Sequence, residues 1–246
     1  ELQDSGFDIV CNKSRQNQYF VGNRYLEVAE LKFLVDAVQA ATFISERKTY
    51  ELIEKVSSLA SPYQSDKLKR NLFVEGKAKT NNEGVFYIVD MLNSAINDQK
   101  TVCFKYYEYA PDKKKVFKHN GQVYEFSPYD LVWNNDSYYV FGWSESHGKV
   151  IKFRVDRMNT PTYSDKPFHC KPDSYNIADY CRHVFMMYDC GKQQKITLYC
   201  DNSLMKAVVD RFGETVSTKK LDSAHFSAEV EVFVSSTFFS WVFTYA

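Results

Sequence analysis

Lys152 and Arg154 are two basic residues that lie two positions apart in the segment 149–155, which alternates as a β-strand does. Side chains two residues apart lie on the same face of a strand, so we expect these two cations side by side. The guanidinium of Arg154 offers five donors in a planar fork and can bind a phosphate through two parallel hydrogen bonds, whereas an ammonium acts as a point charge. The pair is therefore suited to a phosphate-bearing ligand.

Aromatic rings accompany these cations. The chain is rich in them, with 18 Tyr and 19 Phe among its 246 residues, and Tyr139 and Tyr106 are candidates to stack on a nucleotide base. Such stacking contributes ~1–3 kcal/mol per base. Tyr138 and Tyr139 must point to opposite faces of a strand, so we expect only one of them to meet a ligand. Tyr139 could instead belong to the core, as we expect for Phe141 on the same face.

Three further residues have two possible roles each. Arg157 follows the strand, and it either contacts the ligand or forms an ion pair with Asp156 that orders the turn and binds nothing. Ser127 precedes a proline, and it either faces the ligand or caps a turn. His147 precedes a glycine in an expected hairpin loop, where it either contacts the ligand or is merely exposed to solvent.

The net charge limits how nucleic acid could be bound. Lysine plus arginine number 31 and aspartate plus glutamate number 31, which excludes a uniformly basic protein that coats nucleic acid. Any such contact must be a local patch. The run Lys113–Lys115, with Lys118 and His119, is locally basic and is either a solvated turn or a patch that attracts phosphates.

Enzyme and metal-site motifs are missing from the sequence. It contains no Gly-rich phosphate loop, no GxSxG motif and no HExxH motif, so we do not expect an enzyme. The six cysteines include no CxxC pair and no cluster with the spacing of zinc ligands, so we expect no metal and no cofactor. Reduced thiols are favoured over a disulfide framework, because a chain of this length can bury a core without one.

The elements that must position the candidate residues are short strands. They are expected at 102–109, 116–118, 122–126, 129–133, 138–143 and 149–155. Short strands at this spacing predict a small, strongly bent antiparallel barrel. A barrel of this size has room for its core alone, so a ligand would bind on its surface or between its loops.

The chain before the barrel predicts a hairpin and then helices. Strands are expected at 7–11 and 18–21, with Lys13 and Arg15 at the tip of the hairpin that they form. Apolar residues then recur at helical spacing over three segments, which are 26–38, 50–59 and 85–97. The charged stretch 65–70 and the polar stretch 76–84 suggest linkers.

The chain after the barrel begins with a Pro-, Ser- and Asp-rich connection at 159–179. A strand, a helix that stops at Gly213, two strands and a last helix follow, at 195–200, 203–212, 217–221, 226–234 and from 236 onward. This order predicts a compact α+β sandwich. The fold class expected for the whole chain is therefore α+β.

The barrel region also resembles a known family. Four phrases match, in order, the pattern of WYL domains: Ser127 to Val132, Asn134 to Asn135, Tyr138 to Val140 and Phe153 to Met158. In that family a Pro-Tyr-x-Leu strand and a short polar turn precede Trp-Tyr-Leu and then Phe-Arg-Leu-Asp-Arg-Ile. Tyr138 replaces the family's Trp and Val140 its Leu, while the Arg-x-Asp-Arg order of residues 154–157 is kept. The resemblance implies a small Sm- or SH3-like β-barrel whose basic surface includes Arg154.

The resemblance extends over nearly the whole chain. Residues 6–9 and 18–21 look like the wing of the family's winged helix-turn-helix domain, 25–59 like its helical dimerisation segment, and 195–243 like its C-terminal WCX extension. The implied division is a wing at 1–23, a helical segment at 24–75, a WYL domain at 76–165, a connection at 166–193 and a WCX-like extension at 194–246. The DNA-reading helices would precede Glu1 and a last strand would follow Trp241, so we expect a chain truncated at both ends.

Membership of this family would imply a bacterial, cytoplasmic, homodimeric transcription regulator with no membrane association. Its barrel would bind nucleic acid or a nucleotide-like effector, and the wing residues Lys13 and Arg15 would touch promoter DNA. A ligand that binds one arrangement of the dimer better than another would then shift the population. An alternative of a different class is a protein-interaction module that regulates an effector complex. Salt-sensitive binding favours the first possibility, and salt-insensitive apolar binding favours the second.

Overall fold

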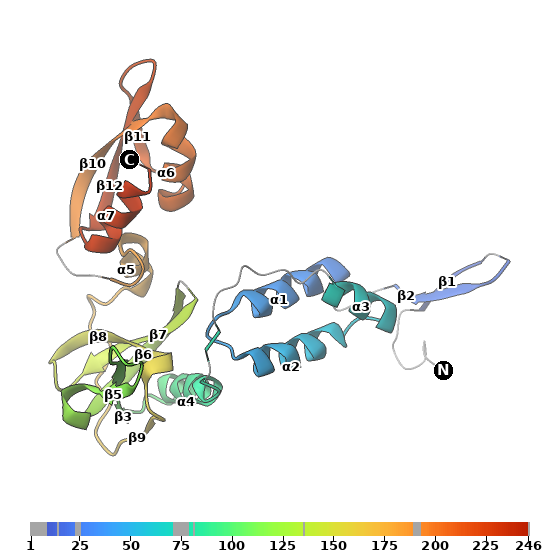
Figure 1. Ribbon diagram of the computed structural model, residues 1–246, viewed down its shortest axis with the longest axis horizontal. Helices are drawn as coiled ribbons and strands as arrows, with labels where there is room; N and C mark the ends of the chain where they lie inside the picture. The colour runs from blue at the N-terminus through green and yellow to red at the C-terminus, as the bar shows by residue number, and fades with distance from the viewer. Residues whose placement is uncertain are drawn as a thin grey trace. The chain divides into compact units, whose positions relative to one another are not determined.

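The computed structural model of the chain (Figure 1) describes residues 9–13, 15–22, 26–70, 79–80, 82–134, 136–188 and 193–245. The chain divides into two compact units, Glu1–Asp90 and Met91–Ala246. The expected strand start at Phe7, the helical segment's start near Tyr25 and the turn residue Asn135 lie outside the described residues. No helix among those that are described is long and apolar enough to cross a membrane.

The first unit begins with the predicted hairpin. Strand β1 (Ile9–Asn12) pairs antiparallel with β2 (Gln18–Val21). Lys13 and Arg15 lie in the loop between the two strands and are exposed. The hairpin is thus confirmed as a structure, whereas its contact with DNA stays a prediction.

Three helices follow, of which one was not predicted. Helix α1 (Val28–Ala40) and helix α2 (Glu46–Ser57) lie in the segments with helical spacing, and the Ser45 hydroxyl caps α2 by accepting a hydrogen bond from the Lys48 amide at 3.2 Å. The expected linker at 65–70 is wrong, because these residues belong to helix α3 (Pro62–Arg70). Proline suits the first turn of a helix, and Leu68, only 3% exposed, attaches this charged helix to the core.

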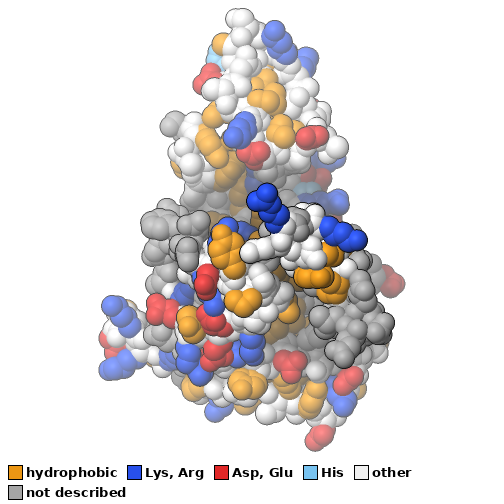
Figure 2. Space-filling model, turned by 90° about the vertical axis from the view of Figure 1, so that its right-hand side faces the viewer, with side chains coloured by type: hydrophobic (Ala, Val, Ile, Leu, Met, Phe, Trp, Pro, Cys, Tyr) orange, Lys and Arg blue, Asp and Glu red, His pale blue; other side chains and the backbone are white. Residues whose placement is uncertain are grey.

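The helices of the first unit leave apolar side chains in solvent. Leu31 and Val35 of α1 are buried, but Phe33 is 73% and Leu34 is 44% exposed. Leu59, just after α2, is 66% exposed. Figure 2 shows hydrophobic side chains at the molecular surface between charged ones. A second copy of the chain could cover such side chains.

Helix α4 (Val85–Asn97) has the bounds that its apolar spacing predicts. An antiparallel sheet follows in the order β8-β7-β6-β3-β9. Its strands are β3 (Val102–Lys105), β6 (Val123–Asn134), β7 (Ser137–Ser144), β8 (Lys149–Arg154) and β9 (Thr162–Tyr163). Strand β6 joins two strands that the sequence analysis separates at Ser127 and Pro128, and the register shifts between Pro128 and Asp130. A separate ribbon consists of β4 (Tyr107–Tyr109) and β5 (Lys115–Phe117).

The five-stranded sheet is strongly bent, as predicted. Strands β8 and β3 are separated in the sheet by β7 and β6, yet the ring centroids of Phe153 and Phe104 lie 5.0 Å apart. Met158, beyond β8, also forms a β-bridge with Tyr106, beyond β3. Gly142 permits the close packing inside, because a Cβ there would lie 2.2 Å from the Ser127 carbonyl oxygen. The sheet therefore curves like the wall of a barrel.

A 3-10 turn follows the ribbon, and a second one follows β8. The first, η1 (Lys118–Gly121), follows β5, and the second, η2 (Val155–Arg157), follows β8. The expected connection at 159–179 is partly structured, because it contains β9 and the start of helix α5 (Ile177–His183). Asn176 caps α5 by accepting a hydrogen bond from the Asp179 amide at 3.0 Å.

The C-terminal part has the predicted order of strand, helix, two strands and helix. These elements are β10 (Gln193–Asp201), η3 (Asn202–Leu204) leading into α6 (Met205–Phe212), β11 (Ser217–Lys220), β12 (His225–Phe233) and α7 (Ser236–Phe243). The sheet order is β10-β12-β11, and the core between sheet and helices includes Phe226, Val232 and Phe238. Gly213 ends α6 with a φ of +86°, a conformation that glycine adopts without a steric cost.

A candidate ligand-binding face on the bent sheet

Strands β7 and β8 place the two candidate cations on the outer face of the sheet. Arg154 lies opposite Tyr139, and Lys152 lies opposite Phe141. Phe153, between the two cations, points the other way into the aromatic core. We call the side chains of Tyr139, Phe141, Lys152 and Arg154 the outer face. Lys152 and Arg154 thus lie on one face, as their two-residue spacing predicts.

Asp156 holds Arg154 in a two-point ion pair. Arg154 donates from Nε to Oδ1 at 3.0 Å and from Nη2 to Oδ2 at 2.8 Å. Burial is the largest single influence on the Arg154 guanidinium and lowers its pKa. The hydrogen bond to Asp156, the charge of Asp156 and the nearby phenols of Tyr139 and Tyr106 together outweigh burial, so the pKa lies above its usual value. Asp156 stands between Arg154 and Arg157 in the sequence, and from the sequence either arginine could be its partner. The structure pairs it with Arg154, because β8 ends there and η2 turns Asp156 back toward the strand.

Arg157, the last residue of η2, is half-buried. It forms no ion pair with any acidic residue in the described part of the chain. Its charge acts on Tyr106 and Tyr139, where it favours the ionised phenol and so opposes the effect of burial on their pKa values. Arg157 therefore adds positive charge near the Arg154 end of the outer face.

The two candidate tyrosines differ in accessibility. Tyr106 is only 8% exposed, its ring packs on Phe153 at 5.0 Å, and its hydroxyl accepts a hydrogen bond from the Arg154 amide at 3.3 Å. Its ring is thus not accessible to a base, and its contact with Arg154 supports the end of β8. Tyr139 is half-buried beside Arg154, and burial raises the pKa of its phenol.

Ser127 and His147 lie away from Lys152 and Arg154, the two cations of the outer face. Ser127 is 1% exposed, and its hydroxyl contacts the Thr101 hydroxyl at 3.1 Å and accepts from the His169 amide at 3.0 Å. It therefore fastens the following chain to the sheet. His147 is exposed in the β7–β8 loop, as predicted, with Nδ1 2.9 Å from the Ser144 hydroxyl. Its ring stacks on Tyr124 with centroids 6.1 Å apart.

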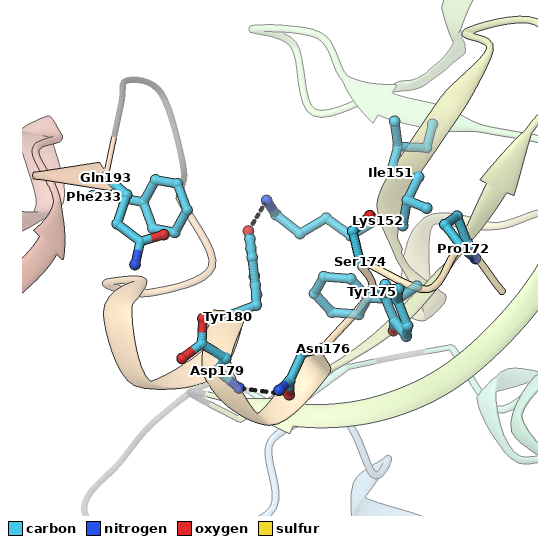
Figure 3. A pocket seen from close by; sticks show the side chains of 12 residues that line it. Ile151, Lys152, Pro172, Ser174, Tyr175, Asn176, Asp179, Tyr180, Gln193 and Phe233 are labelled. Atoms are coloured by element: carbon cyan, nitrogen blue, oxygen red, sulfur yellow. Dashed lines mark hydrogen bonds between the residues drawn. The ribbon is translucent and has the colours of Figure 1, made fainter.

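A pocket of about 330 Å³ adjoins the Lys152 end of the outer face (Figure 3). Lys152 donates a hydrogen bond from Nζ to the Tyr180 hydroxyl at 2.6 Å. The other lining residues are Phe141, Val150, Ile151, Pro172, Ser174, Tyr175, Asn176, Asp179, Gln193 and Phe233. The pocket thus combines apolar walls with one ammonium and a rim of polar side chains, which is the usual composition of a small-molecule site.

Tyr180 is the site residue that the sequence analysis missed. Its ring centroid lies 5.2 Å from that of Phe141 on β7 and 5.7 Å from that of Phe233 on β12. It therefore connects the bent sheet with the C-terminal sheet through α5. Asn176 could have indicated α5, since asparagine is a preferred N-cap residue, but a helix of seven residues gives little periodicity.

Within the part of the chain that the structure describes, the geometry supports neither metal ligation nor a disulfide. Within the described ranges no group of three or more His, Cys, Asp and Glu side chains could hold a metal ion. The five cysteines in these ranges are unpaired: Cys11, Cys103, Cys170, Cys181 and Cys200. The sixth, Cys190, lies outside the described residues.

Comparisons with known proteins add a family match for the central segment. No curated protein matches the chain significantly. A solved structure, proteasome accessory factor B/C (PafBC) of Arthrobacter aurescens, aligns with a TM-score of 0.37 and 16% identity over 99% of this chain. The chain spans 35% of the length of that protein. Residues 87–162, which include Tyr139, Lys152 and Arg154, match the model of the WYL domain.

Proposed function

We propose that this chain is the ligand-sensing part of a DNA-binding transcription regulator and that its bent sheet binds a nucleotide or single-stranded nucleic acid through a phosphate held by Arg154. The observation that carries the proposal is the orientation of Arg154 on the outer face, beside Tyr139 and close to Arg157. The WYL-domain match of residues 87–162 supports a regulatory role for this segment.

The ion pair with Asp156 is compatible with phosphate binding. A guanidinium has five N–H donors, and Asp156 accepts from Nε and from one hydrogen of Nη2. Three donors remain on Nη1 and Nη2, which is enough for a second two-point contact on the adjoining edge of the fork. Asp156 also fixes the fork in one orientation, so less side-chain freedom is lost on binding.

Lys152 and Arg157 would attract a phosphate by their positive charge, whereas Arg154 would fix its orientation. Lys152 is two residues from Arg154 along β8, a separation of ~6.8 Å at ~3.4 Å per residue. A single strand carries one phosphate per nucleotide, so a short strand could contact both cations with different phosphates. Tyr139 lies opposite Arg154 and packs against the Phe141 cluster, and in this proposal its ring contacts a base or sugar.

A protein-interaction module remains a second candidate function. It is favoured by the exposed apolar residues of the first unit, Phe33, Leu34 and Leu59. A protein partner docked there would bind through apolar contacts, and its affinity would change little with salt. Phosphate binding at the outer face would instead weaken steeply as salt rises.

The test is the affinity of the whole chain for a fluorescent oligothymidylate of about four nucleotides, measured by anisotropy at several salt concentrations. Arg154→Ala should weaken binding by ~1.5–3 kcal/mol, the range for charge-assisted hydrogen bonds. Arg47→Ala is the matched control, because Arg47 is also ion-paired, to Glu83, but lies in the first unit. Equal affinities of the two variants, or no binding by the unaltered chain, would remove the proposal.

A further inference from the structure

The β4–β5 ribbon is a separate two-stranded sheet that belongs to neither the five-stranded nor the three-stranded sheet. Tyr107 pairs with Phe117 and Tyr109 with Lys115 in its register. Its turn is closed by two backbone hydrogen bonds, from the Ala110 amide to the Lys114 carbonyl at 2.9 Å and from the Lys113 amide to the Ala110 carbonyl at 2.8 Å. A ribbon held in this way presents its side chains in fixed positions.

The base of the ribbon is anchored beside Arg154. Tyr107 is 6% exposed, and its hydroxyl donates to the Asp156 carbonyl at 2.6 Å. Asp156 is also the residue whose carboxylate orients Arg154. The ribbon and the Arg154 end of the outer face are therefore connected through one residue.

One face of the ribbon carries three aromatic rings and Lys115, and Lys105 of β3 lies beside it. Tyr109 is 58% and Phe117 is 42% exposed. Lys115 Nζ lies 4.5 Å from the ring centroid of Tyr107, and Lys105 Nζ lies 5.7 Å from that of Phe117. Within the described part of the chain, neither lysine has an acidic partner. Lys105 thus lies beside the exposed ring of Phe117, and Lys115 lies over the buried ring of Tyr107 and opposite the exposed Tyr109, each without a carboxylate partner among the described residues.

The opposite face of the ribbon has a different character. Glu108 lies opposite Val116 in the register, and its carboxylate pairs with Lys118 Nζ at 2.5 Å. Val116 is 54% exposed. This face carries a neutralised charge and an aliphatic side chain, so it supplies a matched control for the aromatic face.

We propose that the aromatic face of the β4–β5 ribbon binds single-stranded nucleic acid, with Tyr109 and Phe117 stacking on bases and Lys105 and Lys115 contacting phosphates. Rings interleaved with cations are what a strand with exposed bases requires, and the positive charge of this face complements its backbone. The inference rests on the proposed function, because the ribbon would extend the contact from Arg154 to a longer strand.

The test compares fluorescent oligothymidylates of about four and about 12 nucleotides, and an abasic strand of the longer length, on the whole chain. Tyr109→Ala and Phe117→Leu should each weaken binding of the longer strand at least about fivefold and leave the shorter strand and the abasic strand nearly unchanged. Lys115→Gln should reduce the steepness with which affinity for the longer strand falls as salt rises. The reduction should correspond to the loss of about one phosphate contact. Val116→Ala, on the opposite face, should change neither quantity.

The outcomes separate the two proposals. If the short strand binds through Arg154 but the ribbon variants leave the long strand unaffected, the ribbon inference is wrong and the proposed function stands. If abasic and base-carrying strands bind equally, the ribbon responds to charge alone and the stacking role is wrong. If the short strand does not bind at all, the proposed function fails first. Phe117→Leu keeps an apolar side chain at this position, and circular dichroism of each variant verifies the fold.

Discussion

The Arg154 guanidinium and the Asp156 carboxylate lie side by side, with Nε 3.0 Å from Oδ1 and Nη2 2.8 Å from Oδ2, although only one residue separates them in the chain. If the strand continued through both residues, these positions, two residues apart, would share a face with their Cα atoms about 6.8 Å apart. The contact forms because β8 ends at Arg154 and η2 begins at Val155. The ion pair therefore forms only because the strand stops at Arg154, and it fixes the orientation of the Arg154 guanidinium there.

Replacing Arg154 by lysine tests whether the fork matters beyond its charge. Arg154→Lys keeps a positive charge but replaces the planar fork by a point charge. We expect its affinity for the short oligothymidylate to fall between those of the unaltered chain and Arg154→Ala, with the salt dependence of the unaltered chain largely kept. Anisotropy titrations at low and moderate salt measure both quantities. Full affinity for the lysine variant would show that the site recognises charge alone.

Ser127→Ala tests whether Ser127 supports the fold or meets the ligand. Its hydroxyl is buried between Thr101 and the His169 amide, so we expect the free energy of unfolding to fall by about 1 kcal/mol, the usual loss for a buried hydrogen bond. Urea denaturation measures the loss. Oligonucleotide affinity should not change, and a variant that keeps its stability but binds more weakly would assign Ser127 to the ligand instead.

The sequence predicted elements whose local pattern is strong. Helix α4 has the expected bounds because its apolar spacing is regular, and helix α7 begins where Ser235 caps it. Helix α3 was missed because Leu68 is its only buried apolar residue in a charged segment. Strand β6 was divided because Ser127-Pro128 suggests a turn, whereas the strand accommodates proline at a register shift.

The candidate site was predictable in its composition and only partly in its geometry. The two-residue period placed Lys152 and Arg154 on one face. Which arginine pairs with Asp156 depends on the turn η2, and the burial of Ser127 depends on contacts with Thr101 and His169, which are distant from it in sequence. Neither is visible in residue spacing. Tyr180 reaches the site from α5, a contact between residues distant in sequence that no local pattern contains.

His225 should make the stability of the C-terminal sheet depend on pH. Its Nδ1 lies 2.9 Å from Asp222 Oδ2 and its Nε2 lies 3.2 Å from Asp201 Oδ1, and the bond to Asp222 raises the pKa of the imidazole. A pKa raised by folding stabilises the protein below the unfolded value of about 6.5, and this stabilisation is lost as pH rises through the folded value. The unaltered chain should therefore exceed His225→Gln in melting temperature near pH 5.5 and match it near pH 8.5. A difference of equal size at both pH values would contradict a charge effect.

The helices of the first unit should hold two copies of the chain together. Phe33 and Leu34 lie exposed on α1, and burying such side chains against a second copy contributes ~1.5–3 kcal/mol for each large one. We expect the unaltered chain to be a dimer in light scattering and Phe33→Asp to be a monomer with unchanged helix content, because a carboxylate in an apolar interface would lose its hydration. Tyr199→Asp is the matched control, since Tyr199 is 77% exposed on β10 in the other unit. A strict monomer at high concentration for the unaltered chain, or dissociation by Tyr199→Asp alone, would place the helices outside any dimer interface.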